Sequence, residues 1–421
     1  QIAREAQILT SHMRDFTVHC VFGGIKIDKD KRAFANKPRC DILVATPGRL
    51  IDHLTTNRGF VERFASLHTL VLDECDQLLD MGFRPAINRI LDLLKPSAPR
   101  RQTLLYSATV PKAVMDIART ALKPGYVTVD TVGKEDNTHA HVDQYYLTVD
   151  AEDMFPILLL MLRSHVATVA DYKVIVFFPT ARLAGFATEL FRAVGMDVDE
   201  IHSRKSQPHR TKVSNKIRNS TNVIVFSSDV SGRGVDYPDI SLVVQLGTPS
   251  SADQYTHRLG RTARAGKSGE GIILLAPFET DLVLRRLTRL PLKELAAPPP
   301  RETIDASLAA VKAALRRVSD VSRGQAYQSW LGYYNSVGGL KMSKELLVAT
   351  ANHFATVALG CPPGSPPALL TSTVGKMGLR GTVGLNVVKS LPGGGGGGGG
   401  RGGRGGRGGR GGRGGRGGGR R

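Results

Sequence analysis

Short apolar runs alternate with helix-like segments along this chain, and the alternation occurs twice. In residues 1–132 we expect strands at 17–22, 41–45, 69–73, 102–106 and 126–130, and helices at 1–13, 58–65, 84–94 and 111–122. In residues 143–290 we expect strands at 143–149, 173–178, 198–202, 222–227, 241–246 and 271–276, and helices near 153–163, 181–194, 207–217 and 251–259. Such alternation predicts parallel sheets covered on both faces. The expected fold class is α/β, with two tandem parallel-sheet domains.

The rest of the chain has a different character. A polar linker, 133–142, separates the two domains. After Pro291 the strand alternation stops, and helices are expected at 303–317, 323–335 and 342–359 within a helical extension, 291–390. The final segment, 391–421, is almost entirely Gly and Arg, and it is expected to be disordered because it cannot bury an apolar core.

The charge of the chain favours a polyanionic partner. The formal net charge is +20 and the isoelectric point is about 10.0, which is typical of nucleic-acid-binding proteins. Eight of the positive charges are arginines within residues 401–421, which leaves the remainder at about +12. The Gly/Arg tail is expected to add salt-sensitive affinity for nucleic acid. A flexible solubilising end is the alternative interpretation of the tail.

Cysteine usage and hydropathy suggest an intracellular protein without a membrane span. The cysteines are Cys20, Cys40, Cys75 and Cys361, and no pair has the spacing of metal ligands. No run of 18 apolar residues occurs. The chain starts at Gln1 inside a helix-like pattern, so we expect the natural N-terminus, with any targeting peptide, to be missing.

Three acidic residues follow the predicted strand 69–73. The apolar run ends in Asp73, Glu74 and Asp76, with Cys75 between them. In open α/β sheets ligands bind beyond the carboxyl ends of the strands, where carboxylates can hold Mg²⁺ and orient a water molecule. The alternative is that these acids only cap the next helix.

Other strand ends of the first domain also carry polar or small residues. Ser107 and Thr109 follow strand 102–106 and could bridge the acids to a moving partner, or they could cap the helix at 111. Thr46 and Arg49, around a helix N-terminus after strand 41–45, suit a phosphate backbone, although an ordinary strand-to-helix turn explains them equally well. Gly23 and Gly24 permit a close ligand approach or simply a turn.

The second domain carries two polar motifs. The loop 228–236 combines hydroxyls, acids, glycines and an arginine directly after strand 222–227, which favours a binding loop. Farther on, Arg258, Arg261 and Arg264 are spaced by three, so we expect them on one face of a helical turn, where they would meet an anion. Arginines across a domain cleft can stabilise a transferring phosphoryl group. A solvated basic face is the alternative.

Taken in order, these motifs closely resemble those of DEAD-box ATP-dependent RNA helicases of superfamily 2, over residues 1 to about 290. The resemblance implies two RecA-like domains and RNA-stimulated ATP hydrolysis, coupled to local, sequence-independent unwinding or remodelling of RNA duplexes and ribonucleoproteins. It implies ATP and Mg²⁺ as cofactors, and single-stranded RNA and short duplexes as partners of a monomer. Ribonucleoprotein components are further candidate partners, and no membrane is implied.

The resemblance also implies roles for single residues. Asp73 would hold Mg²⁺ through water, Glu74 would orient the attacking water, and Asp76 would belong to the nucleotide site. Ser107 and Thr109 would couple hydrolysis to RNA opening. His257, Arg261 and Arg264 match the catalytic arginine motif, while Gly234 and Asp236 would bind ATP. The implied RNA contacts are Gly23, Gly24, Thr46, Arg49, Arg210 and Ser228.

One departure from the family pattern matters for activity. The Gly-Lys-Thr phosphate loop and the Gln motif do not occur, and Gly266-Lys267-Ser268 lacks the required upstream Gly because position 261 is Arg. We therefore expect a fragment of an active enzyme that is inactive alone. The alternatives are an RNA-binding or annealing protein without ATPase activity, and a DNA helicase.

Residues 235–238, 244–247, 326–334 and 375–379 resemble the organellar, intron-splicing branch of the family with a helical C-terminal extension. This points to a mitochondrion or plastid, with the nucleus as the alternative compartment.

Overall fold

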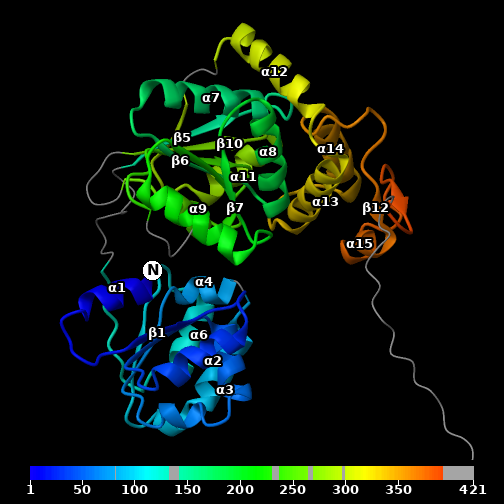
Figure 1. Ribbon diagram of the computed structural model, residues 1–421. Coiled ribbons are helices and arrows are strands. Elements are labelled where there is room, and N and C mark those ends of the chain that lie inside the picture. Colours follow the sequence, from blue (N-terminus) through cyan, green and yellow to red (C-terminus); the bar gives the residue numbers. More distant parts are fainter. Residues whose placement is uncertain (81, 132–141, 230–236, 264–268, 296–298, 392–421) are drawn as a thin grey trace, which may run out of the picture.

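The computed structural model describes residues 1–80, 82–131, 142–229, 237–263, 269–295 and 299–391 (Figure 1). The second domain, in green, lies between the first domain, in blue and cyan, and the C-terminal helices, in yellow and orange. The predicted linker lies outside the described residues except for Val142, and so does the predicted tail except for Leu391. No helix in the described part of the chain is long and apolar enough to cross a membrane.

The first domain alternates strands and helices in the predicted manner. Its strands are β1 (Val18–Val21), β2 (Ile42–Ala45), β3 (Thr69–Leu72) and β4 (Gln102–Leu105). Its helices are α1 (Ile2–Leu9), α2 (Ile27–Asn36), α3 (Pro47–Thr56), α4 (Cys75–Asp80), α5 (Arg84–Leu93) and α6 (Lys112–Ala121), with 3₁₀ turns at Val61–Phe64 and Lys95–Ser97. The strand bounds agree with the expected ones to within one residue.

The four strands of the first domain form two separate parallel pairs. β1 pairs with β2, and β3 pairs with β4. The single sheet that the alternation predicted is not formed, because no strand within the described residues joins the two pairs. The pair β1–β2 packs on an apolar cluster around Phe34 and Phe60, and the pair β3–β4 on another around Ile87 and Ile117, with Leu70 of β3 packed against both. The core of this domain is therefore divided into two clusters that meet at β3.

Three local predictions for the first domain are wrong. Residues 126–130 form no strand, and Val127 and Val129 are exposed rather than buried in a core. The helix expected at 1–13 ends at Leu9, where the Thr10 hydroxyl donates to the Ala6 carbonyl. The helix expected at 58–65 is only a 3₁₀ turn.

The second domain is one seven-stranded parallel sheet. Its strands are β5 (Asp143–Thr148), β6 (Lys173–Phe177), β7 (Asp199–Ile201), β8 (Val223–Ser227), β9 (Leu242–Leu246), β10 (Glu270–Leu275) and β11 (Leu292–Glu294), in the order β11-β5-β10-β9-β6-β8-β7. Its helices are α7 (Met154–Thr168), α8 (Ala181–Ala193), α9 (Gln207–Asn219), α10 (Ala252–Leu259) and α11 (Pro277–Arg286). Because β11 pairs with β5, the sheet continues past residue 290, where the sequence placed the domain boundary.

The sequence explains why this sheet forms. Every residue of β6, β8 and β9 is buried, and such strands read as continuous apolar runs. Three of the helices, α8, α9 and α10, begin at hydroxyl side chains: Thr180, Ser206 and Ser251 accept hydrogen bonds from the backbone N–H groups three residues later. A cap of this kind stabilises a helix by about 1 kcal/mol.

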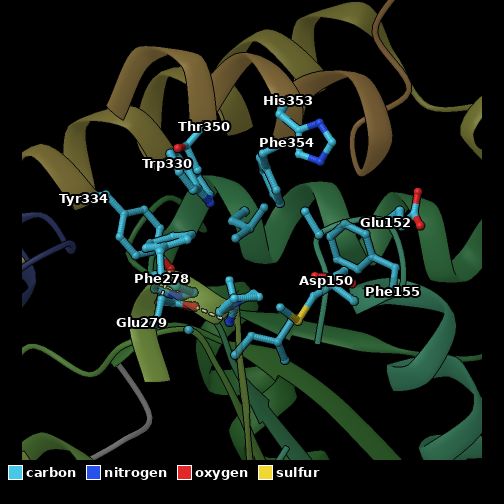
Figure 2. Close-up of a pocket in the computed structure, with 18 residues that line it drawn as sticks. Asp150, Glu152, Phe155, Phe278, Glu279, Trp330, Tyr334, Thr350, His353 and Phe354 are labelled. Atoms are coloured by element: carbon cyan, nitrogen blue, oxygen red, sulfur yellow. Dashed lines mark hydrogen bonds between the residues drawn. The ribbon is translucent and has the colours of Figure 1, made fainter. Parts of the chain in front are cut away.

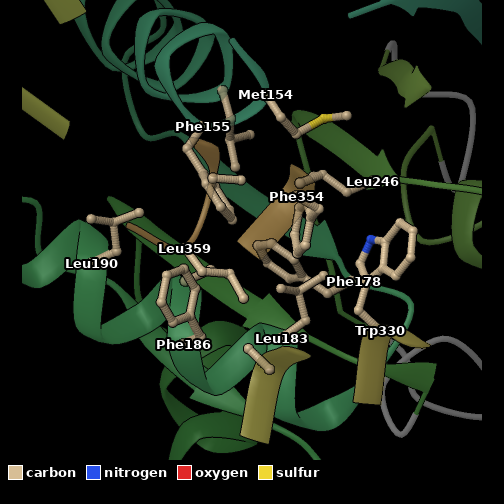
Figure 3. Packing of buried hydrophobic residues seen from close by; sticks show 14 of the residues in the cluster. Met154, Phe155, Phe178, Leu183, Phe186, Leu190, Leu246, Trp330, Phe354 and Leu359 are labelled. Atoms are coloured by element: carbon tan, nitrogen blue, oxygen red, sulfur yellow. The ribbon is translucent and has the colours of Figure 1, made fainter. Parts of the chain in front are cut away.

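The C-terminal helices share the core of the second domain. They are α12 (Arg301–Leu315), α13 (Asp320–Ser336), α14 (Lys344–Val357) and α15 (Thr371–Lys376), followed or flanked by the short strands β12 (Leu369–Leu370) and β13 (Val387–Val388). Figure 3 shows Trp330, Phe354 and Leu359 packed near Phe178 and Phe186 of the second domain, all within one buried cluster. The helical extension is therefore built onto the second domain rather than held apart from it.

Candidate functional site

The acidic residues after β3 lie where the chain turns from strand to helix. Glu74 has a φ of +51°, an uncommon conformation for a residue with a side chain, and its N–H donates to the Asp73 Oδ1 at 3.0 Å. The Asp73 side chain is exposed and Glu74 is half-buried. Cys75 is fully buried, and burial, together with the charge of Asp76, raises the pKa of its thiol to about 11. The turn thus presents two carboxylates at the carboxyl end of β3.

Asp76 is buried and tied to the neighbouring strand end. The Thr109 hydroxyl donates to the Asp76 Oδ2 at 2.9 Å, and the Asp76 N–H donates to the Ser107 Oγ at 3.1 Å. The Ser107 hydroxyl in turn donates to the Thr109 carbonyl at 2.6 Å. Neither hydroxyl caps α6, whose N-cap is Pro111. The structure therefore brings Ser107 and Thr109 to the acids and removes the capping alternative.

The same carboxylate faces the second domain. His257 Nε2, from α10, lies 4.0 Å from the Asp76 Oδ2. The His257 side chain is only 12% exposed, so this contact is largely shielded from water. Asp76 is the point at which β3, β4 and the second domain meet.

Only two of the three arginines that the sequence placed on one helical face lie within the described residues, and these two have different surroundings. Helix α10 ends at Leu259, so Arg261 lies beyond it, and Arg264 lies outside the described residues. Arg258 is 1% exposed and donates from Nε and Nη2 to the Asp229 Oδ1 at 2.9 and 2.6 Å, with its guanidinium 5.4 Å from the centre of the Phe177 ring. Arg258 is thus a buried ion-pair partner that holds the loop after β8.

Arg261 keeps a position suited to the predicted role. It is 8% exposed, and its Nε donates to the His257 carbonyl at 3.1 Å, which places its guanidinium beside the residue that faces Asp76. Sequence reasoning missed Asp229 as a functional residue. The available signal was the position of Asp229 directly after the buried strand β8, in the same domain as Arg258, for which the sequence showed no evident partner. Gly234 and Asp236 lie outside the described residues.

Arg49 does not lie where RNA could reach it. It is 7% exposed, its Nη1 donates to the Asp30 Oδ2 at 2.7 Å, and its Nη2 donates to the Ile25 carbonyl. His53 Nε2 lies 3.3 Å from the same Asp30 oxygen. The direct RNA contact predicted for Arg49 is therefore wrong for this geometry, since burial and Asp30 occupy its guanidinium. Instead, Arg49 fixes the loop that follows Gly23 and Gly24.

Gly24 reaches the second domain. Its φ is +87°, and a Cβ placed on it would lie 3.3 Å from the Cβ of Gln207 at the start of α9. Arg210, one turn further along α9, is half-buried and donates to the Gln207 side chain. Thr46 is the N-cap of α3 but makes no side-chain cap hydrogen bond. The N-terminus of α3 therefore lies on the first domain and that of α9 on the second.

Ser228 and Gly23 differ in how accessible they are to RNA. Ser228 is 7% exposed, and its carbonyl accepts from the Ser227 hydroxyl at 2.6 Å. A Cβ on Gly23 would meet nothing within 4 Å, so this position is open to an approaching ligand. The predicted RNA contacts thus divide into accessible positions at Gly23, Gly24, Thr46 and Arg210 and the buried positions at Arg49 and Ser228.

Two family models match the chain in sequence. The DEAD/DEAH box helicase model matches residues 1–117, and the model of the helicase conserved C-terminal domain matches residues 158–266. The matched ranges hold the acidic turn in the first case and the Asp229–Arg258 pair in the second.

Curated relatives match most of the chain. DEAD-box ATP-dependent RNA helicase 26 of Oryza sativa subsp. japonica is 46% identical over 391 residues, which cover 92% of this chain and 70% of that protein. Helicase 25 of the same species is 45% identical over 389 residues, covering 91% and 63%. Helicase 26 of Arabidopsis thaliana is 43% identical, and the match covers 44% of its length.

Solved structures resemble the fold over nearly its whole length. The structure of Mss116p, with its NTE and C-tail deleted, bound to ssRNA and AMP-PNP has a TM-score of 0.77 at 25% identity, covering 90% of this chain and 76% of that one. Mss116 bound to ssRNA and UDP-BeF has a TM-score of 0.78 at the same identity, covering 90% and 77%.

Proposed function

This chain belongs to the family of DEAD-box ATP-dependent RNA helicases, and we propose that it couples ATP hydrolysis at the acidic turn to the opening of short RNA duplexes held across both domains. The observation that carries the proposal is the position of Asp76. Its buried carboxylate accepts from Thr109 and faces His257, and its backbone N–H donates to Ser107, so a change in the spacing of the domains alters the contacts of this residue.

The hydrolytic step uses the carboxylates at the end of β3. Glu74 would hold the attacking water in line with the γ-phosphorus of ATP, and Arg261 would meet the charge that spreads over the transferring phosphoryl group. Breaking the bond between the γ-phosphorus and its bridging oxygen releases ADP, and the water oxygen forms the new bond to phosphorus. Glu74, half-buried beside Asp73, would hold that water and receive its proton.

The residues present fit Mg²⁺. Asp73 is an exposed carboxylate at a strand end, and one of its oxygens already accepts from a backbone N–H, which fixes its orientation. Oxygen ligands and retained waters are what Mg²⁺ prefers. Bound there, the ion would neutralise phosphate charge, and Asp73 would hold it through water.

RNA would lie over both domains, held through its backbone. The N-termini of α3 and α9 offer N–H groups, Gly23 and Gly24 allow a close approach, and Arg210 adds a positive charge. Contacts of this kind fix the strand without reading its sequence. Closing the domains on it would bend one strand and separate it from its complement.

The 421 residues contain no Gly-Lys-Thr phosphate loop, and this observation favours one alternative, an RNA-annealing protein without ATPase activity. The two functions differ in whether RNA affinity depends on nucleotide. We define the extended protein as this chain with an added N-terminal segment. The segment is the part of helicase 26 of Oryza sativa that precedes the matched region, and it is joined to Gln1. A non-hydrolysable ATP analogue with Mg²⁺ should tighten binding of the extended protein to a labelled single-stranded RNA by about tenfold or more.

Single-stranded DNA of equal length should compete with that RNA poorly, because 2′-hydroxyl groups are what distinguish RNA at a backbone site. RNA affinity that is indifferent to the nucleotide supports the annealing protein instead. Equal competition by DNA supports a DNA helicase.

A further inference from the structure

A pocket of about 450 Å³ lies where the second domain meets the C-terminal helices (Figure 2). Its floor is formed by the ends of β5, β6, β9 and β10, and its other walls come from α7, α8, α11, α13 and α14. None of the residues assigned above to ATP or RNA lines it. A pocket of this size with a few polar groups is large enough for a specific ligand.

Five of the residues that line the pocket carry aromatic rings: Phe155, Phe278, Trp330, Tyr334 and Phe354. The Trp330 ring stacks on Phe354 with centroids 5.2 Å apart, and the Tyr334 centroid lies 4.3 Å from that of Trp330. Phe278 stands 5.3 Å from Tyr334 in an edge-on arrangement. Figure 2 shows Trp330 and Tyr334 on one side and Phe155 on the other. Faces of aromatic rings attract cations.

The charge of the pocket is opposite to that of the chain. Among the described residues that line it there is no Lys or Arg, although the chain carries +20. Asp150 and Glu152 line it with exposed side chains, and the buried Glu279 lies in its wall. Phosphate groups of RNA or nucleotides would be repelled by these acids, whereas a cation with an apolar stem would be attracted.

We propose that this pocket holds the guanidinium group of an arginine from the chain's own Gly/Arg tail, residues 401–421. A guanidinium is flat, stacks on aromatic faces and is weakly hydrated, so it fits between aromatic walls better than an ammonium group does. Glycines flank the arginines of this segment, and they allow its backbone to approach the pocket mouth closely. Asp150 and Glu152 supply the opposite charge.

The chain is long enough to make this contact. Asn352, on α14, donates to the Gly384 carbonyl at 2.8 Å, so the C-terminal segment already lies against the helix that carries Thr350, His353 and Phe354 of the pocket. About 17 residues separate Gly384 from Arg401. Extended, they could span roughly 50 Å, several times the diameter of a helix, about 10–12 Å.

This contact would make the tail a shared ligand. An arginine held in the pocket cannot also neutralise an RNA phosphate, so the pocket and RNA compete for the same side chains. The second domain would thereby keep part of the tail close to the protein until RNA replaces the pocket acids as its partner.

Trp330 is the only tryptophan of the chain, so its fluorescence reports on the pocket directly. The experiment uses the full chain and a variant whose eight arginines from Arg401 to Arg421 are glutamines. A peptide of four Gly-Gly-Arg repeats, titrated into the variant, should change the Trp330 emission in a saturable manner. A peptide of Gly-Gly-Lys repeats should bind about tenfold more weakly.

Substitutions in the pocket locate the effect. In the glutamine-tail variant, Asp150→Asn with Glu152→Gln should weaken peptide binding by about tenfold or more. Glu345→Gln, an exposed acid of α14 outside the pocket, should leave it unchanged. Native-tail protein should already show the shifted emission and should bind added peptide more weakly than the variant does.

Three results would overturn the proposal. One is the absence of a saturable change up to about 5 mM peptide, which exceeds the effective concentration of a tethered tail. Another is binding that Asp150→Asn with Glu152→Gln does not weaken. The third is equal peptide affinity with the native and the glutamine tails, which would show that the tail does not occupy the pocket.

Discussion

Asp76 and Arg49 show how differently two charged residues of one domain are used. Asp76 is buried, yet its carboxylate is shared by Thr109 and faces His257 of the other domain, so its partners change when the domains move. Arg49 is buried to the same degree, but all of its partners lie within the first domain. Burial alone thus does not separate a residue of the site from one that supports it.

Arg49→Ala should destabilise the first domain by about 3 kcal/mol without weakening a direct RNA contact, because it removes the guanidinium paired with the buried Asp30 carboxylate and leaves only His53 beside that carboxylate. Urea unfolding measures this. Arg39→Ala, which breaks the exposed pair with Asp41, is the matched control and should change stability by less than about 1 kcal/mol. If Arg49→Ala leaves the stability unchanged but strongly weakens RNA binding, Arg49 contacts RNA directly.

Gly24→Ala should weaken RNA binding by about three- to tenfold, as a positive φ strains alanine by about 1 kcal/mol and the added methyl meets Gln207. Gly23→Ala adds a methyl that meets nothing within 4 Å, so it is the control and should bind RNA normally. Anisotropy of a labelled RNA measures both. If the two variants behave alike, the contact between Gly24 and Gln207 has no role in domain closure.

At the scale of elements, α13 is held to the sheet through Glu279. The Tyr334 hydroxyl donates to the Glu279 Oε1 at 2.6 Å, the Thr248 N–H and hydroxyl donate to the same oxygen, and the Ala276 N–H donates to Oε2. Burial and the neighbouring Glu279 raise the pKa of Tyr334 well above its usual range, so its hydroxyl remains a donor. One carboxylate therefore joins α11, α13 and the end of β9.

Tyr334→Phe should lower the free energy of unfolding of the second domain with its C-terminal helices by about 1–3 kcal/mol, the range for a hydrogen bond to a buried charged group. Thermal or urea unfolding followed by Trp330 fluorescence measures it. Tyr172→Phe is the control, since its hydroxyl has no hydrogen bond to other described residues. A change at Tyr334 no larger than at Tyr172 would contradict a role of this bond in docking α13.

The sequence predicted best those elements that are buried along their whole length. The strands of the second domain were placed to within one or two residues because β6, β8 and β9 are mostly apolar and are buried along their full length. Helix α2 was missed because only Asp30 and Phe34 of its ten residues are buried, so it shows a weak apolar period. The pairing of Arg258 with Asp229 could not be predicted, since it joins residues 29 positions apart whose distance depends on the whole sheet.

The two halves of the whole molecule differ in how they are packed. The second domain and the C-terminal helices share one large cluster that includes strands buried at every position. In the first domain the strands are only partly buried, as in β2 and β4, and the core is divided between two clusters. The first domain is expected to open more readily.

Hydrogen exchange followed by mass spectrometry should show this difference directly. Amides of β6, β8 and β9 should exchange at least about a hundredfold more slowly than those of β1–β4, because opening the shared core requires a larger loss of buried apolar area. Protection that is uniform over both domains would contradict the divided-core description.

The most direct test of the central claim is RNA-stimulated phosphate release by the extended protein, beside its Glu74→Gln variant, with the 421-residue chain as the baseline. We predict that RNA raises the rate at least tenfold, and that Glu74→Gln lowers it by about 10²–10⁴ while RNA affinity stays the same. An extended protein that binds RNA but releases no phosphate in response to it would contradict the assignment of the acidic turn as a hydrolytic site and would leave RNA annealing as the function.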